Sequence, residues 1–248
     1  MVTIKSRTEI EKMRVAGKIT GDALREIEKH IRAGISTLEL DKIAFDFIKK
    51  QGATPSFLHY NGFPGSICAS PNSWVVHGIP SKSVVLKEGD IISIDMGAQK
   101  DGYHGDAART YAVGKVSDEA KRLIEVTKQS FFEGIKYATH GAKLGDVSSA
   151  IQEFVEKNGF SVVRDLVGHG IGKNLHEDPN VPNYGHKGRG LKLAQGMTIA
   201  VEPMVNAGGY EVVQLDDNWT IETEDGSLSA HYENTILITK GECEILTL

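Results

Sequence analysis

The chain has 248 residues, of which 40% are hydrophobic and 25% charged, and its formal charge at pH 7 is −5. These proportions are typical of a globular protein that buries a sizeable core, as one large domain or two small ones. The mild acidity and the lack of a Lys/Arg block argue against nucleic-acid binding through phosphate contacts. Cys68 and Cys243 are too few for a disulfide framework, so we expect free thiols in a reducing, cytoplasmic compartment.

Two helices are predicted near the start of the chain, where we expect no targeting segment because no apolar run is present. The pattern Thr8-x-x-Glu11 fits a capping box for the first helix, and Ser36-x-x-Glu39 fits one for the second. Gly52 lies where a left-handed residue would end the second helix. The apolar stripes that support both helices are formed by Ile10, Met13, Ala16, Gly17, Thr20 and Leu24, and by Leu40, Ile43, Ala44, Phe47 and Ile48.

Residues 51–81 form the longest stretch of the chain without Asp, Glu, Lys or Arg. Prolines and glycines interrupt it throughout, which excludes a membrane helix and indicates loops and short strands. Its aromatic residues could line a pocket, although a buried connecting segment is the simpler interpretation.

The remaining elements are helices near 118–139 and 144–158 and a larger number of strands. The expected strands cover about 91–97, 103–113, 161–167, 197–203, 211–215, 219–222 and 233–239. Because helices and strands segregate within each half of the chain, the pattern indicates an α+β fold rather than a simple βαβ winding.

The chain repeats itself once. Residues 86–95 and 193–202 both read Leu-x-x-Gly-x-x-Ile-x-apolar-carboxylate, at an offset of 107 residues. The same offset joins three further pairs, which are Gly34 and Gly141, Phe47 and Phe154, and Gly52 and Gly159. We therefore expect two halves of similar build, roughly 1–110 and 111–248, packed as a single catalytic domain over residues 1–248.

Four carboxylates stand beside apolar strands. Asp95 and Glu202 end equivalent runs in the two copies of the repeat, Asp106 follows eleven residues after Asp95, and Glu233 precedes a later strand. A buried carboxylate is costly unless it is paired or bound to metal, and no Lys or Arg directly adjoins these four. A shared cation is one interpretation, and surface charges on edge strands or turns are the other.

Five of the nine histidines lie beside glycines, candidate carboxylates or apolar residues. His169 is flanked by glycines, which allow a ligand or metal to approach the backbone. His104 and His231 each precede a candidate carboxylate by two residues, hence on the same strand face, and the sequence leaves both open as ligands. His77 and His176 follow apolar residues, and histidines of that kind are more often hydrogen-bonded core residues.

The chain resembles the type I methionine aminopeptidases over essentially its whole length. The matching motifs are Val76-His77-Gly78-Ile79-Pro80, Asp95 through His104-Gly105-Asp106, Gly168-His169-Gly170-Ile171-Gly172, His176-Glu177-x-Pro179, Val201-Glu202-Pro203 and Glu233-Asn234-Thr235. The resemblance implies the pita-bread fold, in which two pseudo-symmetric halves share a curved antiparallel sheet covered by helices.

The resemblance also implies a centre of two divalent metal ions. Asp95, Asp106, His169, Glu202 and Glu233 match the family's ligands. The matches to Asp106 and Glu233 bridge both ions, the match to Asp95 chelates one ion, and the matches to His169 and Glu202 hold the other. Such an oxygen-rich set favours Mn²⁺, Fe²⁺ or Co²⁺, and Zn²⁺ also fits.

Three catalytic residues follow from the same resemblance. Glu202 would accept a proton from the attacking water, His176 would stabilise the oxyanion, and His77 would contact the scissile amide. The resemblance leaves His104 and His231 out of the ligand set.

The implied substrates are peptides and nascent chains that begin with Met and have a small second residue. The residues matched to the substrate site are Phe57, Tyr60, Phe63, Cys68, His77, Leu175, His176 and Trp219. Phe57 and Leu175 depart from the residues most common in the family. A monovalent cation near Asn72, Trp74 and Ser229, contact with the ribosome and a monomeric state are further expectations, and no membrane binding is expected.

Two other functions are compatible with these motifs. An X-Pro aminopeptidase or prolidase shares the ligands but usually adds a substantial N-terminal domain, for which the early start of the repeat leaves no room. A non-catalytic peptide-binding module of the same fold would be marked by lost ligands, and all five are present.

Overall fold

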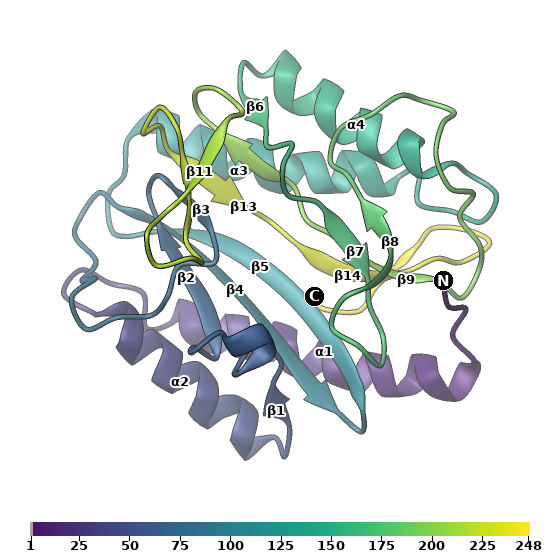
Figure 1. The fold of residues 1–248 in the computed structure, drawn as a ribbon, viewed down its shortest axis with the longest axis horizontal. Helices are drawn as coiled ribbons and strands as arrows, with labels where there is room; N and C mark the ends of the chain where they lie inside the picture. Colours follow the sequence, from purple (N-terminus) through teal and green to yellow (C-terminus); the bar gives the residue numbers. More distant parts are fainter. Residues whose placement is uncertain (1) are drawn as a thin grey trace.

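Two pairs of helices enclose the strands of this chain (Figure 1). The computed structural model describes residues 2–248. Helices α1 (Arg7–Glu28) and α2 (Thr37–Lys50) lie on one side, and α3 (Asp118–Ile135) and α4 (Leu144–Lys157) lie on the other. The chain order therefore places α1 and α2 ahead of the first main strands, and α3 and α4 ahead of the later ones.

The first half is built on a long hairpin. Strands β4 (Ile91–Lys100) and β5 (Tyr103–Ala112) pair antiparallel over their full length. The other edge of β4 binds β1 (Thr54–Pro55) and β2 (Ile67–Pro71), and the short helix η1 (Tyr60–Gly62) lies between these two in the chain.

The second half contains a five-stranded sheet and two small sheets. The larger sheet has the order β15 (Glu244–Ile245), β14 (Asn234–Leu237), β9 (Thr198–Val201), β7 (Gly168–Gly170) and β8 (Glu177–Val181). One small sheet joins β13 (Ser229–His231), β10 (Met204–Asn206) and β6 (Ser161–Val162). The other joins β11 (Val212–Gln214), β12 (Ile221–Thr223) and β3 (Trp74–Val76) from the first half.

The two halves meet where β5 runs beside the start of β14. The backbone N–H of Glu233 donates to the carbonyl of Ala108 at 3.0 Å, and the N–H of Asp106 donates to the hydroxyl of Thr235 at 3.0 Å. Carboxylate-bearing segments from both halves are thereby held side by side at this junction.

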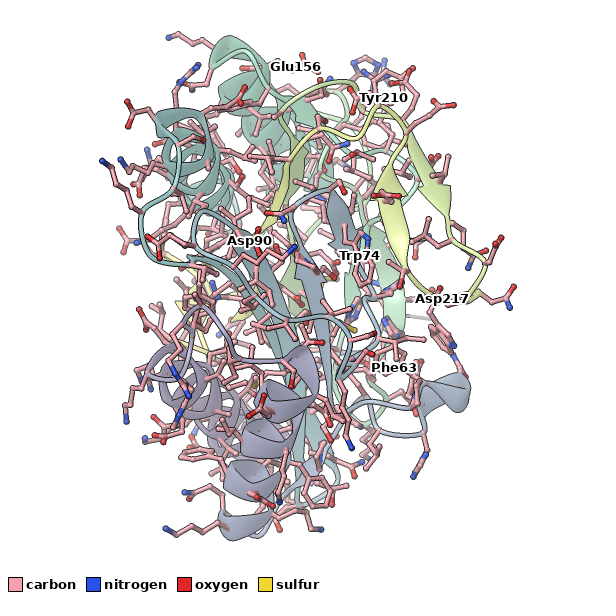
Figure 2. The ribbon with its side chains drawn as sticks, turned by 90° about the vertical axis from the view of Figure 1, so that its left-hand side faces the viewer. Phe63, Trp74, Asp90, Glu156, Tyr210 and Asp217 are labelled. Atoms are coloured by element: carbon pink, nitrogen blue, oxygen red, sulfur yellow. The ribbon has the colours of Figure 1, made fainter. Side chains whose placement is uncertain are left out.

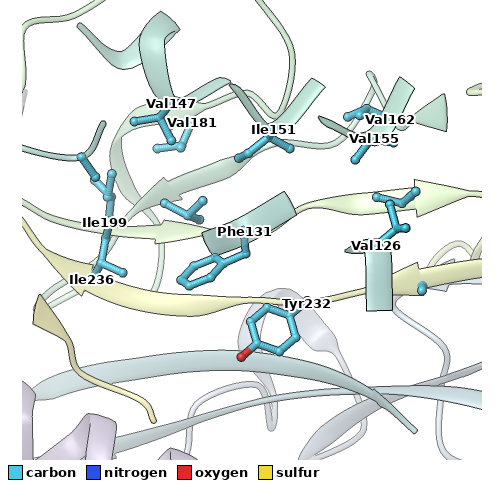
Figure 3. Close-up of a cluster of buried hydrophobic side chains, with 14 of the residues drawn as sticks. Val126, Phe131, Val147, Ile151, Val155, Val162, Val181, Ile199, Tyr232 and Ile236 are labelled. Carbon is cyan, nitrogen blue, oxygen red and sulfur yellow. The ribbon is translucent and has the colours of Figure 1, made fainter. Parts of the chain in front are cut away.

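Each half has its own hydrophobic core. One cluster packs α1 and α2 against β4, with Leu24, Leu40 and Ile94 among its fully buried members. The other packs α3 and α4 against the second-half strands, where Figure 3 shows the ring of Phe131 beside that of Tyr232. Burial of these faces is the main force that stabilises both layers.

Most predicted elements are present, with shifted ends. The second capping box is as predicted at Ser36 and Glu39. The predicted capping box of the first helix is wrong by two residues, because Ser6 caps α1. The Ser6 hydroxyl accepts from the N–H of Glu9, and the Glu9 carboxylate accepts from the N–H of Ser6. Both tetrads fit the pattern, and the extended backbone at Ser6 starts the helix earlier.

The expected strand over 161–167 shortens to β6, because exposed, irregular backbone at Arg164 and Asp165 follows it. Within residues 2–248, no helix is both long enough and apolar enough to cross a membrane.

Candidate metal centre and substrate pocket

The β4–β5 hairpin carries the first two carboxylates. Asp95 pairs with Ala108 and Gly97 with Asp106, so the two aspartates are diagonal neighbours on one face of the sheet. The eleven-residue step from Asp95 to Asp106 thus spans an antiparallel hairpin. Asp106 is 3% exposed, and Asp95 faces Cys68 of β2 across its other edge.

The second half places two glutamates at the ends of a second antiparallel pair. Asn234 of β14 pairs with Val201 of β9, so Glu233 and Glu202 lie opposite each other one residue beyond this ladder. Glu233 is 2% exposed. The equivalent ends of the two half-sheets thus bring all four predicted carboxylates to one place.

His169 of β7 completes the cluster. Its Nε2 lies 3.6 Å from Asp106 Oδ2 and 3.6 Å from Glu202 Oε1. Its Nδ1 lies 2.8 Å from the carbonyl oxygen of Gly170, which fixes the tautomer that leaves Nε2 free as a ligand.

Glycines on both sides of His169 are required by close packing. A Cβ atom at Gly168 would lie 2.4 Å from the carbonyl oxygen of Ala200, and one at Gly170 would lie 2.1 Å from that of Asp178. Any other residue at either position would push β7 away from β9 or β8, and the imidazole would move with it.

The donor atoms form two groups that share one residue. Ligand atoms of Asp106, His169 and Glu233 lie within 4.8 Å of one another, and so do those of Asp95, His231 and Glu233. Two cations with a common carboxylate therefore fit this arrangement.

The buried negative charges of the cluster would be stabilised by bound cations. Asp95 Oδ1, Asp106 Oδ1 and Glu233 Oε1 are buried without a hydrogen-bond partner among the described residues. Burial and the neighbouring charge of Asp106 raise the pKa values of Asp95, Glu202 and Glu233 well above their usual range. Buried, orphaned carboxylate oxygens of this kind are the ligands that hard divalent cations prefer.

Two further histidines border the cluster. The ring of His176 lies 4.2 Å from that of His169, and its Nδ1 is 2.8 Å from the hydroxyl of Tyr60. Burial, and then the neighbouring His169, lower the pKa of His176 to about 4, so it is neutral at pH 7. His77 is half-buried, and burial lowers its pKa as well.

An apolar pocket of about 490 Å³ opens onto the carboxylates. Phe63 and Trp219 meet edge to face with ring centroids 5.1 Å apart, and Figure 2 shows Phe63 beside the loop of Asp217 at one edge of the molecule. Burial raises the pKa of the Cys68 thiol, which stays protonated at neutral pH. The pocket is lined by every predicted ligand, catalytic and substrate residue: Phe57, Tyr60, Phe63, Cys68, His77, Asp95, Asp106, His169, Leu175, His176, Glu202, Trp219 and Glu233.

Comparison with known proteins agrees with this geometry. The model of metallopeptidase family M24 matches residues 11–240. The chain belongs to metallopeptidase family M24.

Within M24, the chain is similar to methionine aminopeptidases over its full length. It is 58% identical to the methionine aminopeptidase of Clostridium acetobutylicum, covering 100% of this chain and 99% of that protein. The crystal structure of methionine aminopeptidase from Thermotoga maritima superimposes with a TM-score of 0.98 at 49% identity, covering 100% of this chain and 99% of that one.

A more distant M24 structure, the Xaa-Pro dipeptidase from Bacillus anthracis, has a TM-score of 0.79 at 26% identity. It covers 98% of this chain but only 61% of the dipeptidase chain. The expected pita-bread fold, with helices over antiparallel sheets, is confirmed by both structures.

Some pocket residues of this M24 chain were missed by the sequence reasoning. Those are Asn61, Val76, Asp165, Leu166, Val167 and Met204. They come from short strands and loops with no periodic signal, so pairing between distant segments, rather than a local pattern, brings them to the site. His104 and His231, which the sequence left open, take different places: His104 lies outside the pocket lining, whereas His231 lines it.

Proposed function

We propose that this protein is a methionine aminopeptidase that removes the initiator methionine from peptides and nascent chains with a small second residue. The observation that carries the proposal is the meeting of five metal-ligand candidates with an apolar pocket at one opening. The similarity to methionine aminopeptidases over the full length supports the same activity.

The pocket suits the side chain of methionine. Phe57, Phe63, Leu175 and Trp219 supply apolar and aromatic surface, and the neutral thiol of Cys68 adds a soft, polarisable contact. An unbranched thioether adapts to such surfaces and gains from sulfur–aromatic contacts.

Five residues would hold two divalent ions: Asp95, Asp106, His169, Glu202 and Glu233. When bound, such ions polarise the scissile carbonyl and lower the pKa of water towards neutrality. We propose Mn²⁺, Fe²⁺ or Co²⁺ as the physiological metal, with Zn²⁺ also compatible, because four carboxylates and one imidazole make an oxygen-rich set.

The side chains around the ions would orient the reaction and move its protons. Glu202 would accept the proton of the attacking water, since its carboxylate is poised between His169 and the pocket. The hydrogen bond between His176 Nδ1 and the Tyr60 hydroxyl holds the ring in place, and in the tautomer in which Tyr60 donates, Nε2–H would donate to the developing oxyanion. His77 lies where the scissile amide would be contacted, beside Trp219.

Further parts of the proposal concern partners. A monovalent cation could bind near Asn72, Trp74 and Ser229, where the N–H of Ser229 already donates to the carbonyl of Asn72 at 2.8 Å. A cytoplasmic location, a monomeric state and contact with the ribosome stay predictions.

A substrate comparison tests the function. The protein is stripped of metal, reloaded with Mn²⁺ or Co²⁺, and offered Met-Ala-Ser and an Ala-Pro peptide. We expect free methionine only from the reloaded sample, because the ions activate the attacking water. Preference for the Ala-Pro peptide would favour the X-Pro alternative, and peptide binding without cleavage of either would favour a binding module.

A further inference from the structure

His231 is buried beside the carboxylate cluster and has no protein partner. It is 1% exposed, and neither ring nitrogen forms a hydrogen bond among the described residues. Its Nε2 lies 3.8 Å from Glu233 Oε2 and 4.0 Å from Glu202 Oε2. Both separations are too long for hydrogen bonds, and the one to Glu233 suits two donor atoms that share a cation.

The strand register fixes the direction of this side chain. Met204 of β10 pairs with His231 of β13. This register continues the pairing of Val201 in β9 with Asn234 in β14. His231 is therefore two residues from Glu233 on the same face, and Met204 is two residues from Glu202. The imidazole and both glutamates project towards the same space.

His104 is the natural comparison, since it also lies two residues before a carboxylate, Asp106, and is 8% exposed. Its Nδ1 is 2.8 Å from the Ser56 hydroxyl, and its Nε2 is 3.1 Å from the Gln99 amide. Both nitrogens of His104 are occupied by the protein, as in an ordinary core histidine. Those of His231 are not.

We propose that His231 is a sixth protein ligand, which joins Asp95 and Glu233 around the cation on the Asp95 side of the centre. The ligand atoms of these three residues lie within 4.8 Å of one another. The assignment rests on the proposed function, because it assumes that both cations are present. It gives each cation one imidazole, His169 on one side and His231 on the other.

An imidazole on the Asp95 side changes which metals that side prefers. Imidazole suits Co²⁺ and Zn²⁺ better than Mn²⁺, whereas an all-carboxylate set suits Mn²⁺ well. Removing His231 should therefore weaken the binding of Co²⁺ more than that of Mn²⁺.

The test compares His231→Gln with the matched control His104→Gln. Chelated protein is titrated with Co²⁺ and with Mn²⁺ by calorimetry. We expect wild type and His104→Gln to bind two ions. In His231→Gln one of the two Co²⁺ sites should weaken by about 10–100-fold, the size of loss seen even for indirect metal partners, while the other site keeps its affinity.

Proton NMR of the Co²⁺-loaded proteins counts the coordinated imidazoles directly, independently of activity. Each one gives a strongly shifted ring N–H signal that disappears in D₂O. Two signals are expected from wild type and His104→Gln, and one from His231→Gln. Circular dichroism confirms that the variants are folded, and His231→Asn repeats the measurement if His231→Gln is not.

The outcomes separate the two proposals. Two bound ions with a single imidazole signal in wild type, or unchanged Co²⁺ affinities in His231→Gln, would overturn the assignment of His231 alone. A wild-type protein that binds no divalent ion would contradict the proposed function as well.

Discussion

At the scale of single residues, His176 illustrates how the site prepares a neutral donor. Burial and the neighbouring His169 lower its pKa to about 4, so it carries no charge at pH 7. The hydrogen bond between its Nδ1 and the Tyr60 hydroxyl orients the ring, with Nε2 as its other nitrogen. A neutral donor can stabilise an oxyanion without repelling cations bound nearby.

Replacing His176 should therefore affect the chemical step more than binding. We expect His176→Ala to keep both metal ions and to lower kcat by about 10²–10³-fold, the usual cost of losing one oxyanion donor. Tyr60→Phe keeps the imidazole but loses the bond that orients it, so its loss of kcat should be smaller. Steady-state kinetics with metal analysis checks both variants, and a rise in KM at unchanged kcat would contradict the role of His176.

The sequence predicted residues of this site well where they lie next to a recognisable local pattern. Asp95 and Glu202 end apolar runs, and His169 stands between glycines, so each is marked by its immediate neighbours. His231 carries no such mark. Only the structure shows that its nitrogens lack partners whereas those of His104 have them, because the partners Ser56 and Gln99 are remote or on another strand.

At the scale of elements, the segment before α1 fastens the loop that carries His176. Lys5 Nζ donates to Glu177 Oε2 at 2.6 Å, and the hydroxyl of Thr3 donates to the same oxygen at 2.7 Å. The side chains of Lys5 and Glu177 are 5% and 9% exposed. Burial alone would raise the pKa of Glu177, but these hydrogen bonds lower it below its usual value.

Breaking this pair should destabilise the fold. Lys5→Met keeps the apolar stem but leaves the buried Glu177 carboxylate without its positive partner, so we expect the free energy of unfolding to fall by about 3–5 kcal/mol at pH 7. A lowered carboxylate pKa contributes stability above its unfolded value of 4.5, and that contribution is lost as the pH falls through the lowered value. The difference between wild type and variant should therefore shrink below pH 4.5.

Urea denaturation at pH 7 and in acid measures both effects. Lys18→Met is the control, because Lys18 forms an exposed pair with Asp22, and pairs of that kind contribute about 0–1 kcal/mol. Equal losses in the two variants would show that the Lys5–Glu177 pair has no special role.

Elements differ in how far the sequence predicts them. The helices follow from stripes and caps that lie within a single segment, and the ends of α2 and α4 were predicted to within a residue or so. Strands β7, β10 and β13 have three residues each and no period of their own. They exist because they pair with distant segments, so a local pattern cannot reveal them.

At the scale of the whole molecule, the junction of the two halves concentrates negative charge. Among the described residues, none of Asp95, Asp106, Glu202 and Glu233 forms an ion pair with Lys or Arg, and the basic side chains within 4.0 Å of them are His169 and His231. Without cations, the packing of both cores is opposed by repulsion at their shared centre. Bound metal should therefore stabilise the entire fold as well as the reaction.

After metal removal, the stability of the fold should fall as the pH rises. The carboxyl groups of Asp95 and Glu202 have higher pKa values in the folded protein than the usual 3.8 and 4.5, so the folded protein binds more protons than the unfolded chain. Stability therefore falls as the pH rises from these usual values towards the raised pKa values of the folded state. In the chelated double variant Asp95→Asn, Glu202→Gln this loss is removed.

Calorimetric melting at pH 5.5 and pH 8 measures the effect. We expect the chelated double variant to exceed chelated wild type by about 1–3 kcal/mol at pH 8, as when buried charges are replaced by neutral groups, and by less at pH 5.5. Added Mn²⁺ should reverse the order, because wild type gains about 2.7 kcal/mol per site at a concentration 100 times Kd and the variant has lost two ligands. A chelated variant less stable than wild type at pH 8, or an order unchanged by Mn²⁺, would contradict the assignment of a metal centre to this junction.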